Sequence, residues 1–467
     1  MTYSDALTYI FSFTNFEVTP AQTYTSKTFD LTRMERLLTL LGEPQRKFQS
    51  IHVAGTKGKG STAAMIESIL RAANHSTAFY TSPHLHTFRE RIRVNGEMIS
   101  KEDVVAGVQK LKPIVDQVPG VTTFEVMTAL AFDYFAARDV EFAVLEVGLG
   151  GRLDATNVVA PRVAVITSIS YDHVSILGNT LTQIAAEKAG IIKPAVPVVS
   201  SPQQDEARAV IENIAYEKNA PLIQVSSLTS QAAGLKFQVA GVTFQVTPAA
   251  ASLDGQTFRL ESATGNLQPM TGDLQPVTYD LKLLGNHQLA NAATALAACL
   301  VLQTQGVEIP IDAMREGIRN VEWHGRFEIL SRQPYLIIDG AHNGDSARQL
   351  ARTLRNFFPQ SKLHLIFGAS GDKDIPAIFA ELLPHVASLT LTRSHNPRAA
   401  DLARLADLAA PYHVEMRPTN DLAEALRVTL QDTEPNDVVC VTGSLFVVAE
   451  AREIWLAQHG VNLEKDE

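Results

Sequence analysis

The chain has 467 residues, of which 45% are hydrophobic and 19% are charged, and its formal net charge at pH 7 is −10. This composition is that of an ordinary globular protein with room for two or three domains. The negative charge argues against nucleic acid or an anionic membrane as a main partner. An acidic substrate would therefore have to be held by a local group of Lys, Arg and backbone N–H donors.

The lack of a recognisable targeting signal and the use of cysteine both favour a cytoplasmic protein. No Lys or Arg occurs in Met1–Ser26, so the basic region of a signal peptide is missing. The longest apolar segment, Leu289–Leu302, is Ala-rich and interrupted by polar residues, which predicts a core helix rather than a membrane span. Cys299 and Cys440 stand far apart in apolar surroundings, and we expect buried thiols of a reducing compartment.

The first part of the chain alternates predicted helices and buried strands. Apolar periodicity predicts an amphipathic helix over Asp30–Leu41, and a short apolar strand, Ile51–Ala54, follows it. The later elements are predicted as strands Thr77–Tyr80, Phe142–Val147, Arg162–Ser168 and Val196–Val199, and as helices Ser100–Val115, Thr122–Arg138 and Thr180–Ala189. Apolar strands separated by helices are typical of a parallel sheet.

A glycine-rich and lysine-rich loop follows the strand Ile51–Ala54 and precedes a predicted helix. It consists of Gly55, Thr56, Lys57, Gly58, Lys59, Gly60 and Ser61. Glycines let backbone N–H groups turn toward an anion, the helix N-terminus adds partial positive charge, and Lys59 can reach terminal phosphates. The general P-loop pattern has Gly where Val53 stands and Ser or Thr where Gly60 stands. If magnesium binds, its hydroxyl ligand must therefore come from elsewhere. The alternative to a phosphate-binding loop is a flexible turn with a surface lysine, which the strand-loop-helix context disfavours.

Acidic and imidazole side chains occur at the ends of two predicted strands, where open α/β sheets bind their ligands. Glu146, within Phe142–Val147, is costly to bury as a lone charge, so we expect either a structural ion pair or a magnesium ligand. Asp172 and His173 follow the strand Arg162–Ser168. A lone His is more often a core residue, but beside Asp172 it is an equally good site candidate.

The sequence pattern changes twice in the second half of the chain. Alternating runs in Ser226–Leu284, separated by Gly and Asp, predict a small antiparallel sheet, and Asp312–Asn320 predicts a short helix. Near Trp323 a new alternation begins, with strands predicted at Tyr335–Asp339, Leu363–Phe367, Ser388–Leu391, His413–Met416 and Val438–Val441. We therefore expect an α/β protein with an N-terminal P-loop domain over residues 1–322, mostly a parallel sheet with an antiparallel subsheet. A doubly wound, Rossmann-like domain follows over residues 323–467.

Asp339 ends the strand Tyr335–Asp339 and is followed by Gly340-Ala341-His342-Asn343. This repeats, in the second domain, the placement of polar residues at a strand end. A cap for the next helix is an alternative role for Asp339, and the two roles are compatible. Two domains that each present strand ends imply a cleft, which suits a ligase with ATP on one side and an acceptor or amine on the other.

Together these motifs resemble the folylpolyglutamate synthase family, including its bifunctional dihydrofolate synthase members, a branch of the Mur ligases. The segments that carry the resemblance are residues 55–61, 81–84, 146–157, 187–193, 324–326 and 339–343. The resemblance implies that a folate carboxylate attacks the γ-phosphate of ATP and that the amine of glutamate displaces phosphate from the acyl phosphate. A γ-linked amide, ADP and phosphate result. Phosphorylation supplies the leaving group that a carboxylate lacks, and magnesium with Lys59 offsets the charge of two anions.

The resemblance also implies ligands for two magnesium ions, and it allows a potassium ion beside them. Ser82 and Glu146 match ligands of one magnesium ion, and His173 matches a contact of the second. Ser82 would supply the hydroxyl that Gly60 lacks. Lys188 matches a lysine that can be carbamylated to N6-carboxylysine, an anion near the second metal. A surface lysine at a helix end is the alternative.

Further matches complete the expected site. Asn291 and Arg326 match nucleotide contacts beside the loop 55–61, and Asp339 faces the nucleotide from the second domain. His342 matches a residue near the incoming glutamate, and residues 83–93 match a mobile loop between the nucleotide and folate sites. The expected catalytic residues are therefore Lys59, His173, Lys188, Asp339 and His342.

Three other functions are alternatives to a folate ligase. Cell-wall amino-acid ligases place a UDP-binding domain ahead of the P-loop, whereas 54 residues precede Gly55. A P-loop kinase or switch ATPase would not need the motif around Asp339. A non-catalytic nucleotide-binding regulator would not need to keep together the four residues Lys59, Ser82, Glu146 and His173. We expect a monomer that binds ATP, L-glutamate and either dihydropteroate or a reduced folate; the sequence leaves both acceptors and the polyglutamate length open.

Overall fold

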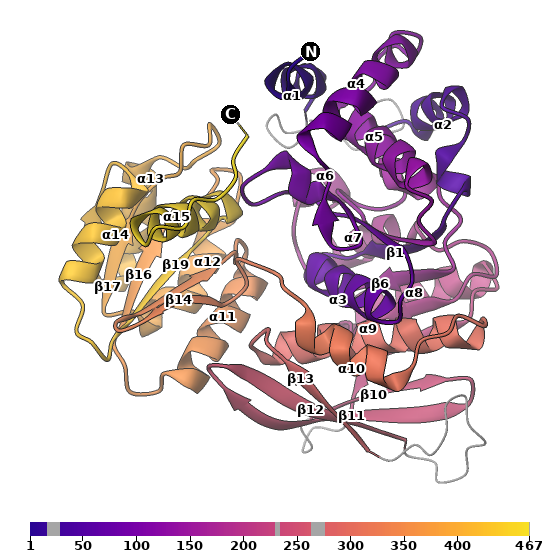
Figure 1. Ribbon diagram of the computed structural model, residues 1–467. Coiled ribbons are helices and arrows are strands. Elements are labelled where there is room, and N and C mark those ends of the chain that lie inside the picture. Colours follow the sequence, from indigo (N-terminus) through magenta and orange to yellow (C-terminus); the bar gives the residue numbers. More distant parts are fainter. Residues whose placement is uncertain (16–28, 229–233, 263–275, 467) are drawn as a thin grey trace.

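The computed structural model describes residues 1–15, 29–228, 234–262 and 276–466. Figure 1 shows two bodies: the larger carries the elements up to α10, and the smaller carries those from β14 onward. The predicted mixture of a parallel sheet, an antiparallel subsheet and a second α/β unit is confirmed. The exact boundary between residues 322 and 323 stays a prediction.

An eight-stranded sheet forms the centre of the larger body, in the order β4-β3-β2-β5-β1-β6-β7-β8. Its strands are β1 (Gln49–Ala54), β2 (Thr77–Tyr80), β3 (Ile92–Val94), β4 (Glu97–Met98), β5 (Phe142–Glu146), β6 (Val163–Ile166), β7 (Val198–Ser200) and β8 (Leu222–Gln224). The neighbouring strands β2-β5-β1-β6-β7-β8 pair in parallel, and β3 and β4 add an antiparallel edge next to β2. Because β1 lies between β5 and β6, the phosphate loop, Glu146 and the segment after β6 leave the same edge.

Alternating side chains of the central strands pack against helices on both faces of this sheet. Phe142 and Val144 join one core with α3 (Lys59–Ala72), α9 (Asn286–Thr304) and α10 (Ile311–Asn320). Ala143 and Leu145 join the opposite core. That face is covered by α1 (Tyr3–Phe11), α2 (Leu31–Leu40), α4 (Lys101–Val115) and α5 (Thr123–Ala137), and further along by α7 (Leu181–Ala189) and α8 (Asp205–Glu217). Because successive side chains of a strand point to opposite faces of the sheet, alternate residues of β5 belong to different cores.

A five-stranded antiparallel sheet lies against α9 and α10 (Figure 1). It consists of β9 (Ser226–Ser227), β10 (Leu235–Val239), β11 (Val242–Ser252), β12 (Gly255–Ser262) and β13 (Val277–Leu281). Its inward side chains, Phe244 and Phe258 among them, extend the core over the α9 helix. The predicted antiparallel sheet is confirmed, and residues 229–233 and 263–275 of the predicted segment lie outside the described residues.

The smaller body is a six-stranded sheet in the order β14-β15-β19-β16-β17-β18, parallel except for β14. Its strands are β14 (Glu328–Arg332), β15 (Tyr335–Asp339), β16 (Leu363–Phe367), β17 (Ser388–Leu391), β18 (Glu415–Pro418) and β19 (Val438–Thr442). One face packs on α11 (Gly344–Phe357), α12 (Ile375–Leu382) and α13 (Leu402–Ala409). The other packs on α14 (Leu422–Gln431) and α15 (Leu445–Gln458).

Most predicted elements are present, with Asp30, Ser100 and Thr122 serving as helix N-caps. The predicted strand Arg162–Ser168 is shorter, because β6 ends at Ile166 and the Ser168 carbonyl turns to accept the Thr56 and Lys57 N–H groups. The predicted strand His413–Met416 starts later, because His413 adopts a left-handed φ of 53°.

Both cysteines are buried free thiols, as predicted. In the part of the chain that the structure describes, no helix combines the length and the apolar character needed to cross a membrane. The Ala-rich helix α9 is buried along its middle, as predicted for a core helix.

Candidate active site

The phosphate loop is held in a conformation that only glycine suits at two positions. Gly58 has φ +86°, and a Cβ there would lie 2.2 Å from Asn291 Oδ1. A Cβ at Gly60 would lie 2.6 Å from the Trp323 ring. The helix α3 begins at Lys59, directly after its N-cap Gly58, so its free N–H groups open at the loop. The strand-loop-helix arrangement predicted for an anion site is therefore present.

Asn291 and Arg326, both predicted nucleotide contacts, lie beside elements of the loop and of the second domain. Asn291 projects from α9 against Gly58. The Arg326 guanidinium lies against Gly340, and a Cβ at Gly340 would come within 2.6 Å of its Nη1. Burial lowers the pKa of Arg326, and the nearby Asp339 and Glu146 carboxylates oppose that shift. Arg326 thus lies between acidic groups of the two domains.

The alternative role of Asp339 as a helix cap is wrong. The helix α11 begins at Gly344, and its N-cap is Asn343. Asp339 instead accepts the N–H groups of Phe327 and Ala341, each at 2.9 Å. The bond to Ala341 fixes the turn after β15. The bond to Phe327 holds the segment that carries Arg326, just before β14, against that turn.

Glu146 forms the ion pair that was one of the two roles left open by the sequence, whereas its role as a magnesium ligand stays a prediction. It is 5% exposed at the end of β5, and its carboxylate lies 4.0 Å from Lys59 Nζ. Burial raises the pKa of Glu146, while Lys59, the Thr81 hydroxyl and the backbone N–H of Ser82 favour its charged form. Ser82 follows Thr81 directly, so a carboxylate and a hydroxyl occur together beside the phosphate loop. This set of hard oxygen donors fits magnesium completed by phosphate oxygens and water.

Within the described ranges, no group of three or more His, Cys, Asp and Glu side chains could hold a metal ion. A magnesium ion at Glu146 would therefore depend on hydroxyl, phosphate and water oxygens for the rest of its shell. His173 lies beside Asp172, with its Nε2 3.9 Å from Asp172 Oδ1. Its side chain is 39% exposed, which leaves the ring accessible.

Lys188 is not a surface lysine. It is 5% exposed on α7, and its Nζ donates to the Gly55 carbonyl at 2.8 Å. Burial, aided by the nearby Lys59 ammonium, lowers the pKa of Lys188 to about 7. The alternative of an exposed lysine at a helix end is wrong, and the amine lies under the phosphate loop.

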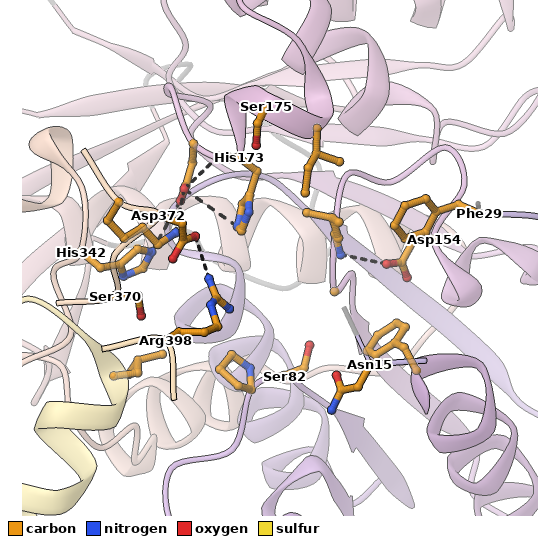
Figure 2. A pocket seen from close by; sticks show the side chains of 18 of the residues that line it. Asn15, Phe29, Ser82, Asp154, His173, Ser175, His342, Ser370, Asp372 and Arg398 are labelled. Carbon is orange, nitrogen blue, oxygen red and sulfur yellow. Dashed lines mark hydrogen bonds and ion pairs between the residues drawn. The ribbon is translucent and has the colours of Figure 1, made fainter. Parts of the chain in front are cut away.

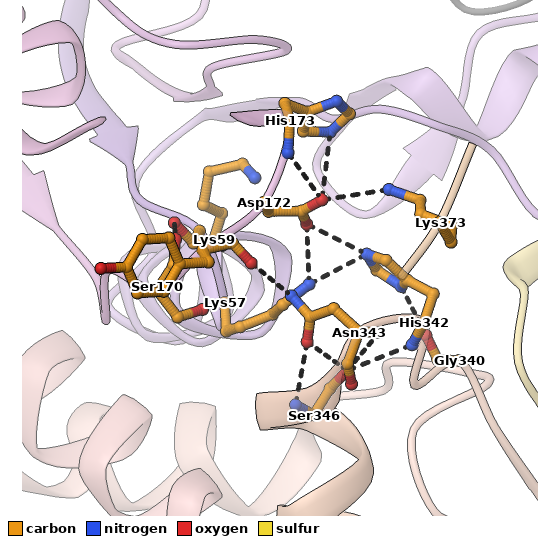
Figure 3. Close-up of polar contacts among 12 residues, drawn as sticks. Lys57, Lys59, Ser170, Asp172, His173, Gly340, His342, Asn343, Ser346 and Lys373 are labelled. Carbon is orange, nitrogen blue, oxygen red and sulfur yellow. Dashed lines mark hydrogen bonds and ion pairs between the residues drawn. The ribbon is translucent and has the colours of Figure 1, made fainter. Parts of the chain in front are cut away.

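Asp172 joins cations and a histidine from both domains (Figure 3). Its Oδ2 lies 3.0 Å from Lys57 Nζ, and its Oδ1 lies 3.1 Å from Lys373 Nζ. Burial would raise the pKa of Asp172, but Lys57 and its other neighbours hold it well below the usual range. Lys57 comes from the phosphate loop and Lys373 from the segment after β16, so one carboxylate links the two bodies.

His342 completes this cluster as a neutral ring. Its Nε2 lies 2.9 Å from Lys57 Nζ, and because an ammonium only donates, that nitrogen accepts. Its Nδ1 therefore carries the proton and donates to the Gly340 carbonyl at 2.8 Å. Burial and the nearby Lys57 ammonium lower the pKa of His342 to about 4.

A cavity of 460 Å³ opens beside this cluster and is lined by both bodies. In Figure 2, Asn15, Phe29 and Asp154 lie on one side of it, and His342, Ser370, Asp372 and Arg398 lie on the other. Ser82, Asp172 and His173 also line it, together with the apolar side chains of Phe124, Leu149 and Leu153. The cavity thus joins an apolar part in the larger body to a charged part between the bodies.

Sequence reasoning missed Lys373 and did not single out Asp154 as a site residue. Lys373 lies in Gly371-Asp372-Lys373, shortly after the end of β16, and the strand-end argument used for Glu146 could have found it. Asp154 is buried, accepts the Leu149 N–H at 2.9 Å, and lines the cavity.

Comparison with known proteins identifies the family. The description "Mur ligase middle domain" matches residues 53–299, and "Mur ligase, glutamate ligase domain" matches residues 325–445. A Bacillus subtilis protein named dihydrofolate synthase/folylpolyglutamate synthase is 34% identical over 97% of this chain and 98% of its own length. The chain belongs to the folylpolyglutamate synthase/dihydrofolate synthase family of the Mur ligases.

Two solved members of this family share the fold throughout. Escherichia coli FolC in complex with DHPP and ADP has a TM-score of 0.80 and 30% identity, covering 98% of this chain and 99% of that one. Mycobacterium tuberculosis folylpolyglutamate synthase complexed with ADP and AMPPCP has a TM-score of 0.80 and 34% identity, covering 94% and 97%. The family resemblance drawn from the motifs is therefore confirmed, whereas the individual site residues stay predictions.

Proposed function

We propose that the chain is a ligase that uses ATP to join L-glutamate to the carboxylate of a folate or of dihydropteroate through an acyl phosphate. The observation that carries this proposal is the cluster around Asp172. There, Asp172 contacts both Lys57 of the phosphate loop and Lys373 of the second body. Lys57 also contacts His342 of the second body. A nucleotide phosphate and an amine bound by opposite bodies would thus meet at one carboxylate-lined cavity.

The residues of the phosphate loop would bind and polarise ATP. The N–H groups at the start of α3 would face the β- and γ-phosphates, and Lys59, 18% exposed, would extend to the γ-phosphate. Ser82 and Glu146 would hold magnesium, which when bound offsets the charge of the phosphates. Asn291 and Arg326 would border the nucleotide. These contacts place positive charge where the transferred phosphoryl group carries negative charge.

The second body would bind the amine. His342 accepts a hydrogen bond at Nε2 and has a pKa of about 4, so it removes a proton from an ammonium poorly. We infer that it orients the amine of glutamate rather than deprotonating it. Lys373 and Arg398, which line the cavity from the same body, suit the carboxylates of the amino acid.

The apolar part of the cavity would bind the acceptor. Phe124, Leu149 and Leu153 offer flat and aliphatic surface, and Asp154 adds a buried carboxylate. A planar heteroaromatic ring with N–H donors, as in a pterin, fits such a combination. The expected monomeric state, the potassium ion and the cytoplasmic location remain part of this proposal.

One assay tests the proposed function and its acceptor. Purified protein is supplied with Mg-ATP and L-glutamate, and phosphate release is compared with dihydropteroate, with tetrahydrofolate and without acceptor. We expect release that needs an acceptor and L-glutamate together, with formation of the amide confirmed by mass spectrometry. Equal release in the absence of both acceptors would contradict a folate ligase.

A further inference from the structure

The tail segment 461–466, which follows α15 of the smaller body, crosses to the larger body. Figure 1 shows its end near the first helix of the chain. Asp466 Oδ1 accepts hydrogen bonds from the hydroxyls of Tyr3 and Thr87, each at 2.6 Å. Its Oδ2 accepts the backbone N–H of Phe88 at 2.6 Å. One carboxylate of the tail therefore binds both α1 and the short helix η2 (Phe88–Arg91) of the other body.

Three further contacts join the two bodies in this region. Glu464 pairs with Arg89 of η2, and it lies 3.7 Å from Lys101 at the start of α4. On α15 itself, Arg452 lies 3.2 Å from His86 Nε2 and donates to Glu328 at 2.9 Å. Residues of the smaller body thus contact both ends of the segment 86–89.

Hydrogen bonds connect this segment to the neighbouring residues that line the cavity. Glu90 accepts the N–H groups of Leu85, His86 and Thr87 at 2.8 to 3.1 Å. Arg91 donates to His84 at 2.7 Å, and its carbonyl accepts the Thr81 N–H at 3.1 Å. Residues 81–91 therefore behave as one unit, whose Ser82 and Pro83 line the cavity.

We infer that Asp466 is a positioning residue: the tail segment 461–466 straps the smaller body to residues 86–89 and thereby holds Ser82 and Pro83 in place at the cavity. Three hydrogen bonds to one carboxylate are charge-assisted and geometrically specific. The strap acts on the loop that carries Ser82 and Pro83, and it touches neither the phosphate loop nor Lys59. It should therefore affect acceptor binding and, through Ser82, the magnesium requirement, more than the binding of magnesium-free nucleotide.

The direct test is hydrogen exchange of the Phe88 amide in the full-length chain. We expect Asp466→Ala to speed that exchange about tenfold or more, because the acceptor of the Phe88 N–H, Asp466 Oδ2, is removed. Arg332→Ala is the matched control: it removes another exposed link between the bodies, to Asp254 at 2.6 Å, but leaves the tail intact. Unchanged exchange at Phe88 in Asp466→Ala would overturn the strap.

The functional test rests on the proposed ligase activity. We expect Asp466→Ala to raise the KM for the acceptor about five- to tenfold, with the affinity for magnesium-free nucleotide within about twofold of wild type. Tyr3→Phe should raise it less, and it should add nothing in the Asp466→Ala background, because both act through one carboxylate. Faster exchange without any change in acceptor KM would overturn the positioning role.

The two tests separate the inference from the proposed function. If wild-type protein turns over neither acceptor, the ligase proposal fails, whereas the exchange experiment still decides whether the strap exists. If Arg332→Ala changes the exchange of Phe88 as much as Asp466→Ala does, the effect is a general loosening of the two bodies, and the specific strap is refuted.

Discussion

The burial of Lys188 predicts that its amine reacts with CO₂ at neutral pH. An ordinary lysine with a pKa near 10.5 is neutral in roughly one molecule of three thousand at pH 7. Burial lowers the pKa of Lys188 to about 7, so about half of the amines are neutral there. Only the neutral amine attacks CO₂, forming a carbamate and releasing a proton. The reactive form is thus enriched on the order of a thousandfold.

The pH dependence of carbamate formation gives the first measurement. At a fixed concentration of dissolved CO₂, we expect the rate of carbamate formation on Lys188 to increase from pH 6 to pH 8 with a midpoint near 7, because the lowered pKa makes the amine neutral there. Isotope-labelled CO₂ and NMR can follow the carbamate carbon, and high-resolution density can locate it. A rise that begins only above about pH 10 would refute the reasoning, since it would mark an ordinary exposed amine.

Substitution gives the second measurement. We expect Lys188→Ala to lose most ligase activity, and we expect short carboxylic acids to restore part of it by filling the vacated anion position under the loop. Lys193→Ala is the matched control, because its Nζ also donates to a backbone carbonyl, that of Asn157, at 2.8 Å. A fully active Lys188→Ala variant with an unchanged melting temperature would exclude a role for the carbamate.

Three further predictions test the rest of the site. Lys59→Ala should reduce product formation by roughly a thousandfold while the circular dichroism spectrum stays that of the folded protein, because the γ-phosphate loses its cation; turnover near the wild-type rate would remove Lys59 from the site. Ser82→Ala and Glu146→Ala should each raise the magnesium concentration for half-maximal activity about tenfold or more, since both supply oxygen ligands; an unchanged requirement in Ser82→Ala would mean that another group replaces the hydroxyl absent at Gly60. Asp172→Asn should separate the two bodies, because it leaves the Lys373 ammonium without its carboxylate at 3.1 Å; small-angle scattering of the liganded enzyme should show a larger radius of gyration than wild type, and an equal radius would count against the link.

Local sequence determined the pieces of this protein. The run of glycines and lysines after a short apolar strand specified the phosphate loop, because turn chemistry and helix starts depend on neighbours within a few residues. The same local patterns placed Glu146 at the end of β5 and Asp339 at the end of β15. They could not tell that Asp339 would bind the amide of Phe327, because that contact depends on how two segments meet.

Only the tertiary structure decided which of these pieces share a site. Asp172 lies 115 residues from Lys57 and 201 from Lys373, and Asp466 lies 463 residues from Tyr3. No periodicity extends over such separations. These contacts follow from the order of strands in the sheets and from the packing of one body against the other, which bring distant segments to the same edge. The burial that lowers the pKa of Lys188 has the same origin, because the end of α7 is shielded from solvent only when the phosphate loop packs over it.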